Sequence, residues 1–276
     1  MSRLFAAEVV AQRPIAERHL QLVVRAEGSL PPAVPGQFMM VACHPVGSAA
    51  PEPLLRRPLS IAGFDQREGT LEMIYRIQGR GTKALSRLAP RERISLLGPL
   101  GRGFTWRPGQ GRPGLVGGGV GVPPLLFLAE RMRAGGLEPA AFLGFGRRAV
   151  AFGMDRLAAA GVPVELATDD GSAGWHGRVT DLVAERARAR QLDALYACGP
   201  VPMLAATAAL AARLGLPCQL CLEALMGCGV GACLTCVWPV RKAGTDGPFA
   251  YRRVCRDGPV FGAEEVCFDA DARPAP

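Results

Sequence analysis

Four cysteines near the carboxyl end of the chain have the spacing of an iron–sulfur site. Cys228, Cys233 and Cys236 form a C-x4-C-x2-C run, and Cys255 follows after 18 intervening residues. This spacing is typical of plant-type [2Fe–2S] centres, whose ligands are cysteine thiolates. We therefore predict that the four cysteines ligate one [2Fe–2S] cluster. Glycines give the loop the freedom to wrap closely around two iron atoms. They are Gly227, Gly229 and Gly231.

Two alternatives concern the metal and its fourth ligand. A structural zinc site usually pairs its ligands as two C-x2–4-C knuckles, and this loop has one such knuckle. Cys221 and Cys267 are alternatives to Cys255 as the fourth ligand, although Cys267 and Cys43 resemble ordinary small apolar residues. Cys218 and Cys221 lie on a strand-like run, so their side chains should point to opposite faces and no redox dithiol is expected.

A glycine-rich run, GGGVGVPP at residues 117–124, lies between a strand-like and a helix-like segment. Glycine lets the backbone approach a pyrophosphate, and the N-terminus of the following helix favours its negative charge. The run departs from the G-x-G-x-x-G pattern because Pro124 stands where the third glycine would be. It predicts dinucleotide contacts at Gly118, Gly119 and Gly121.

Two later joints between strand-like and helix-like segments support a dinucleotide site. Asp169 ends one strand, where its carboxylate can bind ribose hydroxyls and repel a 2′-phosphate, which favours NAD over NADP. Cys198 and Gly199 end another strand at the same carboxyl edge of the expected sheet. Arg147 and Arg148 argue for NADP, because they place two positive charges after the second strand.

The net charge of +8 is concentrated in one segment. Residues 56–112 carry 12 basic and 4 acidic side chains, whereas the residues on either side are balanced. A nucleic-acid-binding protein would spread basic residues along a face with aromatic residues among them. A compact cationic block suits a phosphate-bearing ligand or an acidic partner instead. A solvated basic surface is the alternative.

This basic segment contains two short motifs that suit a flavin pyrophosphate. Arg57 begins the run Arg-Pro-Leu-Ser, and Gly81-Thr82 stands where a loop enters a short helix. An arginine and a helix N-terminus capped by threonine bind phosphate well. Between the motifs, Tyr75 and its neighbours offer an aromatic or backbone contact and a further cation at Arg76. The alternative is that the first motif is a turn and Thr82 only a helix cap.

The composition and patterning indicate the elements that must position these motifs. The chain has 276 residues, of which 49% are hydrophobic and 20% charged, which excludes disorder, collagen and coiled coil. Short alternating runs in residues 1–107 predict a small antiparallel β-barrel. Alternating strand-like and helix-like segments in residues 113–222 predict a doubly wound α/β nucleotide-binding domain. Residues 223–276 form the cluster-binding segment, which lacks periodicity, so we expect something other than a core to hold it.

The sequence shows neither a signal peptide nor a membrane span, which predicts a cytoplasmic protein. The N-terminus lacks the apolar region of a signal peptide. One long charge-free stretch, residues 194–212, is interrupted by Gly199, Pro200 and Pro202 and predicts a strand followed by a helix, with no membrane span. Nine cysteines in a reducing compartment favour metal or redox chemistry.

The ordered motifs together resemble the electron-transfer subunits of class B dihydroorotate dehydrogenases, within the ferredoxin reductase-like flavoproteins. The resemblance covers nearly the whole chain. It implies FAD in the barrel, NAD in the second domain and a [2Fe–2S] cluster in the last segment. Relatives with Arg-x-Tyr-Ser stack the tyrosine on the flavin, so a residue other than Leu59 must cover the ring here. The implied FAD contacts are Arg57, Pro58, Leu59, Ser60, Ile74, Tyr75, Arg76, Gly81 and Thr82.

The resemblance also implies a reaction and a partner. A catalytic dihydroorotate dehydrogenase subunit would oxidise dihydroorotate in pyrimidine biosynthesis, and electrons would pass through the cluster and FAD to NAD⁺. We expect a heterotetramer with two copies of each subunit. No acid–base triad is expected: His19, His44 and His176 are isolated, and Glu223 is given no catalytic role. The alternatives are a similar subunit of a sulfide-, ferredoxin- or hydrogenase-linked NAD(P)H oxidoreductase, and a zinc-stabilised binding module without enzymatic activity.

Overall fold

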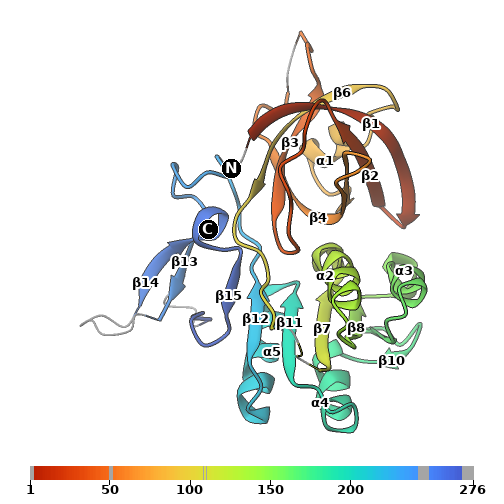
Figure 1. The fold of residues 1–276 in the computed structure, drawn as a ribbon, viewed down its shortest axis with the longest axis vertical. Helices are drawn as coiled ribbons and strands as arrows, with labels where there is room; N and C mark the ends of the chain where they lie inside the picture. Colours follow the sequence, from red (N-terminus) through yellow and green to blue (C-terminus); the bar gives the residue numbers. More distant parts are fainter. Residues whose placement is uncertain (1–2, 50–51, 108, 110, 242–248, 269–276) are drawn as a thin grey trace.

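The protein forms an antiparallel barrel above an α/β sheet, with a small segment beside both (Figure 1). The computed structural model describes residues 3–49, 52–107, 109, 111–241 and 249–268. Six antiparallel strands close the barrel in the order β1-β2-β5-β4-β3-β6. The predicted antiparallel barrel is confirmed. Its strands are β1 (Arg3–Ala16), β2 (His19–Ala26), β3 (Phe38–Pro45), β4 (Arg57–Asp65), β5 (Thr70–Arg76) and β6 (Arg93–Leu100).

Alternating side chains fill the barrel, as the period of two requires. Leu22 and Val24 on β2 are fully buried, as are Leu71 and Met73 on β5. Helix α1 (Arg80–Leu85) follows β5 and contributes its buried Leu85 to the same core. The strand ends that carry the Arg-Pro-Leu-Ser and Gly-Thr motifs are therefore fixed by a packed interior.

The second domain is a doubly wound sheet of order β10-β9-β8-β7-β11-β12-β15, which confirms the predicted α/β fold. The chain passes from β7 outward to β9 and then returns to β11 and β12 on the other side. Ligands bind at such a change of direction, outside the carboxyl ends of the strands. The strands are β7 (Pro113–Gly118), β8 (Ala140–Phe145), β9 (Val164–Thr168), β10 (Trp175–His176), β11 (Ala194–Cys198) and β12 (Cys218–Cys221).

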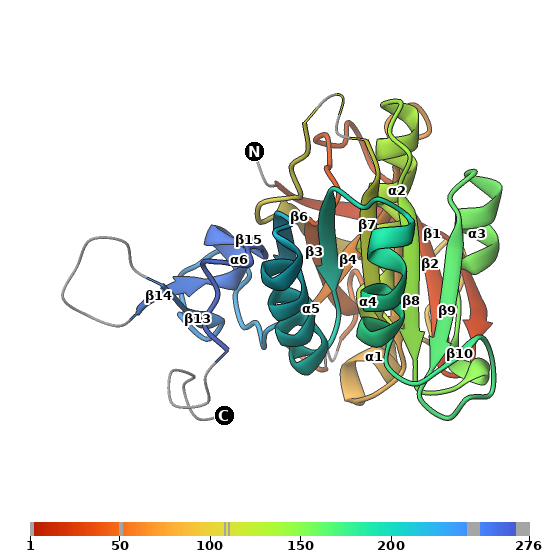
Figure 2. The ribbon, with the colours of Figure 1, turned by 90° about the horizontal axis from the view of Figure 1, so that it is seen from below.

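Helices cover both faces of this sheet. Helices α4 and α5 lie on the face away from the barrel, as the view from below shows (Figure 2). Helix α2 lies between the sheet and the barrel, and its Phe127 packs into the barrel core. The helices are α2 (Val122–Ala134), α3 (Met154–Ala159), α4 (Val179–Ala189) and α5 (Val201–Leu214), with short turns at Gly119–Gly121 and Arg148–Val150.

The C-terminal segment has a core, so the expectation that something else must hold it is wrong. Strands β13 (Val237–Val240) and β14 (Ala250–Arg253) form a hairpin, and helix α6 (Val254–Asp257) follows. Strand β15 (Val260–Gly262) pairs with β12 and extends the α/β sheet. Buried Trp238 and Phe261 join the core that contains α5 and β11. Strands of three or four residues are too short to show periodicity.

The charge-free stretch forms β11 followed by α5, as predicted. Across the described part of the chain, no helix has the length and apolar character that a membrane span needs.

Candidate functional site

A cavity of 510 Å³, here called the barrel cavity, brings together all nine residues of the expected FAD site. Arg57 to Ser60 come from β4, Ile74 to Arg76 from β5, and Gly81 and Thr82 from α1. The opposite wall is formed by residues 222–226 and Pro259. The cavity thus lies between the barrel and the start of the cluster segment.

The Arg57 side chain packs against the first turn of α1. A Cβ atom at Gly81 would overlap the Arg57 guanidinium, so a side chain there would displace the arginine. Thr82 is the third residue of the helix and Gly79 is the N-cap, which corrects the expectation of a threonine cap. The Thr82 hydroxyl accepts the N–H groups of Gln78 at 2.9 Å and Gly79 at 3.2 Å. It thereby shapes the loop that enters the helix.

The Tyr75 side chain points into the barrel core, so it does not cover the flavin ring. Its hydroxyl donates to Gln12 Oε1 at 2.8 Å, its ring packs in the barrel core, and burial raises its pKa. Leu59 is also in that core. Among the residues of the opposite wall, Leu225 and Met226 have side chains long enough to cover a flavin ring. Sequence analysis missed them, although they follow β12 at the carboxyl edge of the sheet.

A second cavity of 820 Å³, the nucleotide cavity, lies at the carboxyl edge of the α/β sheet. Gly118 at the end of β7 and Gly119 just after it line the cavity, as do Arg147 after β8 and Asp169 after β9. Sequence analysis did not identify several residues that also line it, because they come from the barrel, from other loops and from helices α4 and α5. These include His19, Gln78, Val150, Arg178, Thr180 and Met203.

Three of the expected dinucleotide residues, Gly121, Cys198 and Gly199, do not line this cavity. A Cβ atom at Gly121 would overlap the carbonyl of Cys198, so the loops after β7 and β11 touch there. A Cβ atom at Gly199 would come within 3.0 Å of the Gly118 backbone nitrogen. The Cys198 thiol meets that of Cys221 across neighbouring strands, and this hydrogen bond together with burial raises its pKa. These residues support the loops that line the cavity.

Charged groups that line the nucleotide cavity are partly paired. Arg147 Nη2 lies 2.8 Å from Glu17 Oε1 in the turn between β1 and β2. Asp170 accepts the Ser172 hydroxyl at 2.6 Å, which lowers the pKa of Asp170. Asp169 also lines the cavity. The positive charge of Arg147 is therefore shared with a carboxylate of the barrel.

The two cavities meet between the domains. Both are lined by Arg76, Gln78, Val120 and Glu223, which come from the barrel, the glycine loop and the start of the cluster segment. Glu223 faces both cavities with an exposed side chain, and the protein atoms around it displace enough water to raise its pKa. A ligand in one cavity can therefore touch a ligand in the other.

The cluster cysteines are arranged as two pairs. Cys228 Sγ accepts three backbone N–H groups of its loop, including that of Ala232 at 3.3 Å and that of Cys233 at 3.5 Å. Cys236 Sγ accepts the Cys255 N–H at 3.4 Å. In the described residues, no three His, Cys, Asp or Glu side chains gather in a way that would hold a single metal ion. Two thiol pairs suit a centre with two metal atoms better than a four-ligand zinc site.

The outer and inner pairs differ in electrostatic environment. Burial opposes ionisation of Cys228, but the backbone N–H groups outweigh it and lower its pKa. The hydroxyl and backbone N–H of Thr235 lower the pKa of Cys233 to about 6. Burial, with the neighbouring Cys236, raises the pKa of Cys255 to about 12. Metal binding at these cysteines would therefore have to displace a tightly held proton from Cys255.

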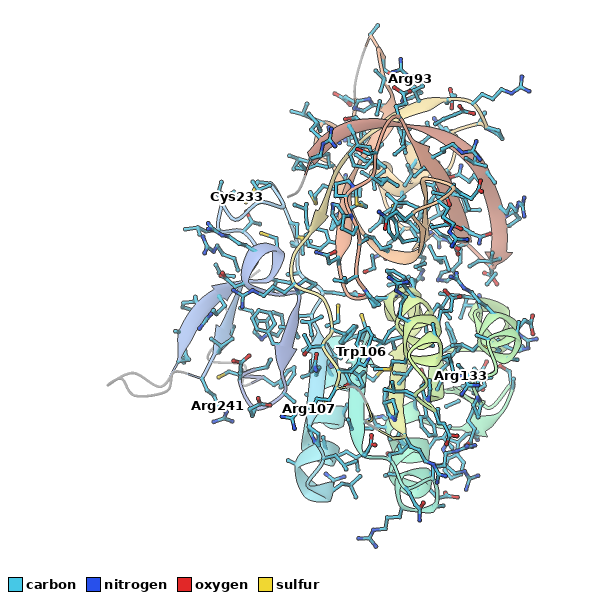
Figure 3. All side chains as sticks on the ribbon, viewed as in Figure 1. Arg93, Trp106, Arg107, Arg133, Cys233 and Arg241 are labelled. Atoms are coloured by element: carbon cyan, nitrogen blue, oxygen red, sulfur yellow. The ribbon has the colours of Figure 1, made fainter. Side chains whose placement is uncertain are left out.

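The cluster loop lies on the barrel. Gly229 and Gly231 have φ of +74° and +83°, and a Cβ atom at Gly229 would come 2.5 Å from Met40 Cγ on β3. Cys233 is exposed and lies on the outside of the segment at its end next to the barrel, whereas Arg241 lies at the other end (Figure 3). The outer thiol pair thus faces solvent and the inner pair faces the protein.

The histidines have no shared site. His19 is buried against Phe152, with ring centroids 5.2 Å apart, and its Nδ1 lies 2.8 Å from the Glu17 carbonyl oxygen. That carbonyl can only accept, so Nδ1 carries the proton. His44 is half-buried and His176 is exposed.

A barrel joined to a doubly wound sheet, with one cavity on each and a common border, defines the class of ferredoxin reductase-like flavoproteins. The NADH-dependent reduced ferredoxin–NADP oxidoreductase, solved in work on flavin-based electron bifurcation, has a TM-score of 0.81 and 29% identity to this chain. The match covers 95% of this chain and 90% of that one. The Amycolatopsis cytochrome P450 reductase GcoB shares the fold with a TM-score of 0.65 and 24% identity, over 77% of this chain and 66% of that one.

Comparison with curated sequences identifies the family. Residues 223–267 match the iron–sulfur cluster binding domain of dihydroorotate dehydrogenase B. The dihydroorotate dehydrogenase B (NAD(+)) electron transfer subunit of Geobacillus kaustophilus is 45% identical over 94% of this chain and 96% of its own length. That of Desulforamulus reducens is 34% identical over 98% and 100%. The chain belongs to this family of electron transfer subunits, which confirms the resemblance of its motifs.

Proposed function

We propose that this chain passes electrons from a dihydroorotate-oxidising catalytic subunit to NAD⁺, by way of a [2Fe–2S] cluster and FAD. The observation that carries the proposal is the continuity of three sites. Residues at the start of the cluster segment form one wall of the barrel cavity. Four residues line both the barrel cavity and the nucleotide cavity. When bound, the cluster supplies one-electron chemistry and FAD converts it to the two-electron chemistry of nicotinamide.

The residues of the barrel cavity fit FAD. Arg57 lies across the first turn of α1, where helix N–H groups have no intrahelical partner, so together they would bind the pyrophosphate. Leu225 and Met226 would cover the flavin ring in place of the aromatic residue that relatives use. The remaining contacts of β4 and β5 would come mainly from the backbone, because Leu59 and Tyr75 point into the barrel.

The thiol pairs fit the two iron atoms of a [2Fe–2S] cluster. Cys228 and Cys233 would hold one iron, and Cys236 and Cys255 the other. The backbone N–H groups on Cys228 would stabilise the negative charge of the sulfur ligands. Cys221 is engaged with Cys198, and Cys267 is buried beside Trp238, which favours Cys255 as the fourth ligand.

Exposed apolar side chains around the cluster loop indicate where the catalytic subunit docks. Leu234 and Val230 are 58% and 46% exposed. Apolar groups gathered on a surface mark an interaction site, and electron transfer requires the partner's redox centre to lie near the cluster. We infer a heterotetramer with two copies of each subunit, which acts in the cytoplasm in pyrimidine biosynthesis.

We predict that NADH is preferred over NADPH. Asp169 faces the nucleotide cavity, and Arg147 is paired with Glu17. A 2′-phosphate would meet like charge there, so we expect kcat/KM for NADH to exceed that for NADPH by at least about tenfold. Steady-state assays with an artificial acceptor measure both values.

The matched variants are Asp169→Asn, which should reduce this ratio, and Asp155→Asn, which should leave it unchanged. Asp155 is exposed and does not line the cavity. Equal kcat/KM for the two nucleotides in the unmodified protein would mean that Arg147 or Arg148 dominates the site.

The proposed function predicts that activity toward dihydroorotate depends on the partner. The isolated chain should oxidise NADH with ferricyanide and leave dihydroorotate unchanged. Adding the flavin-bearing catalytic subunit should produce NAD⁺-dependent dihydroorotate oxidation in the same assay. If the catalytic subunit has no effect while another co-purifying oxidoreductase becomes NAD-linked, the cofactor sites stand and the proposed partner is wrong.

A further inference from the structure

Arg156, on α3 of the α/β domain, forms ion pairs with both domains. Its Nε lies 2.7 Å from Glu130 Oε1 on α2, and its Nη1 lies 2.6 Å from Glu72 Oε1 on β5 of the barrel. Its Nη2 donates to the carbonyl oxygen of Ala62 on β4 at 3.0 Å. All three guanidinium nitrogens are therefore bound, on three different elements. We call Arg156, Glu72, Glu130 and Ala62 the interdomain clamp.

The barrel is shaped to receive this guanidinium. The pairing of β4 with β5 passes from Ile61 directly to Gly63, so Ala62 forms a bulge and its carbonyl is free to turn toward Arg156. Such bulges are features that redirect a strand locally. A Cβ atom at Gly63 would come 2.9 Å from Arg156 Nη2, so a side chain there would push the guanidinium aside.

The carboxylates of the clamp are held as well. Gln21 Nε2 donates to Glu72 Oε1 at 2.8 Å, and Glu130 receives a second bond from Arg156 Nη2 at 3.2 Å. The side chains of Arg156 and Glu72 are only 26% and 18% exposed. The partly buried pair with Glu72 and the bidentate pair with Glu130 have a defined geometry, unlike ion pairs on the surface.

The clamp joins the elements that carry the two cavities. Ala62 lies two residues beyond Ser60 on β4, and Glu72 lies two residues before Ile74 on β5, so each is about 7 Å along its strand from the barrel cavity. Helix α2 begins directly after the glycine loop of the nucleotide cavity, and Glu130 lies about 12 Å along it. Arg156 therefore ties the glycine loop, through α2, to the two strands of the flavin site.

We infer that Arg156 is a positioning residue for hydride transfer. It touches neither expected cofactor, and it fixes the distance at which the nicotinamide meets the flavin. The inference rests on the proposed function, in which NADH loses one hydride and becomes NAD⁺ while bound FAD takes up that hydride with its two electrons. Reacting atoms must lie within about 3.5 Å, and a displacement of about 1 Å can slow a reaction about a hundredfold.

The test compares Arg156→Ala and Arg156→Lys with Arg186→Ala in the full chain loaded with its cofactors. Arg186 on α4 is the matched control, because its pair with Glu165 at 3.0 Å lies within one domain. Anaerobic stopped-flow absorbance gives the hydride transfer rate at saturating NADH and the dissociation constant of NADH. The long-wavelength charge-transfer band of NAD⁺ on the reduced flavin reports their contact independently of turnover.

We expect Arg156→Ala to slow hydride transfer at least about tenfold and to weaken the charge-transfer band, with less than about a threefold change in NADH affinity. Arg156→Lys should give partial rescue, because an ammonium keeps the charge but not the planar fork. Arg186→Ala should match the unmodified protein in all three measurements.

An unchanged rate and band in Arg156→Ala would overturn the inference, as would an equal loss in Arg186→Ala. If Arg156→Ala does not retain FAD, Glu130→Gln provides the test instead. Slower hydride transfer with a weaker charge-transfer band in Glu130→Gln supports the positioning role, and an unchanged hydride transfer rate overturns it. Failure of the proposed function is distinguishable, because the unmodified protein itself would then transfer no hydride from NADH to its flavin.

Discussion

Replacing Cys255 with serine is expected to stop electron flow between the catalytic subunit and FAD. Serine is a poor replacement for the soft thiolate that iron–sulfur clusters require. Loss of an outer-shell group alone costs about 10- to 100-fold in metal affinity, so loss of a ligand should lower NAD⁺-dependent dihydroorotate oxidation at least about a hundredfold. Electron paramagnetic resonance of the reduced protein should show the cluster signal absent or strongly altered. Oxidation of NADH by ferricyanide through FAD should change less than about twofold.

Two further variants control this experiment. Cys267→Ser changes another buried cysteine and should leave the signal unchanged. Cys233→Ser changes the exposed ligand, so it should perturb the cluster with no disturbance of the core. An unchanged signal in Cys255→Ser would mean that the fourth ligand is Cys221 or Cys267. Loss of the signal in Cys267→Ser would then identify Cys267, and a retained signal would leave Cys221.

Replacing Gly121 with alanine is expected to abolish most of the reactivity with NADH. The new Cβ atom would overlap the carbonyl of Cys198, which is backbone and cannot move aside as a flexible side chain would. The loops after β7 and β11 must then separate, which displaces Gly118 and Gly119 in the nucleotide cavity. We expect kcat/KM for NADH to fall at least about a hundredfold, the effect of a shift of about 1 Å in a reacting group.

The matched control is Gly135→Ala, at the opposite end of α2. Its Cβ atom would meet its nearest neighbours at 3.4 Å, an ordinary contact. Flavin and cluster absorbance should be unchanged in both variants, because the barrel cavity and cysteine loop do not involve either glycine. Full kcat/KM in Gly121→Ala would show that the contact between the two loops does not shape the nucleotide site.

Sequence reasoning succeeded where the determining signal is local. The six barrel strands follow from alternation within each run, and the doubly wound sheet follows from strand-like and helix-like segments in turn. Three of the four cluster cysteines lie within nine residues, from Cys228 to Cys236, so their spacing is visible in the sequence itself. Each of these patterns can be recognised without knowing what packs against it.

Sequence reasoning failed where the answer depends on distant parts of the chain. Ile74 and Tyr75 are consecutive and both buried, so alternation could not show that the tyrosine points to Gln12. Glu223 is brought to the border of both cavities only by the meeting of two domains. The interdomain clamp combines a bulge in β4 with an arginine 94 residues away from Ala62, and no motif signals such a pair.

The most direct test of the electron path is the anaerobic absorbance of the flavin and cluster when dihydroorotate is added. With the isolated chain, we predict no bleaching of either cofactor. With the catalytic subunit present, both should bleach, and NAD⁺ should then restore them. Bleaching of the isolated chain by dihydroorotate would contradict its role as an electron transfer subunit. Two cofactors that stay oxidised in the assembled complex would contradict the proposed path.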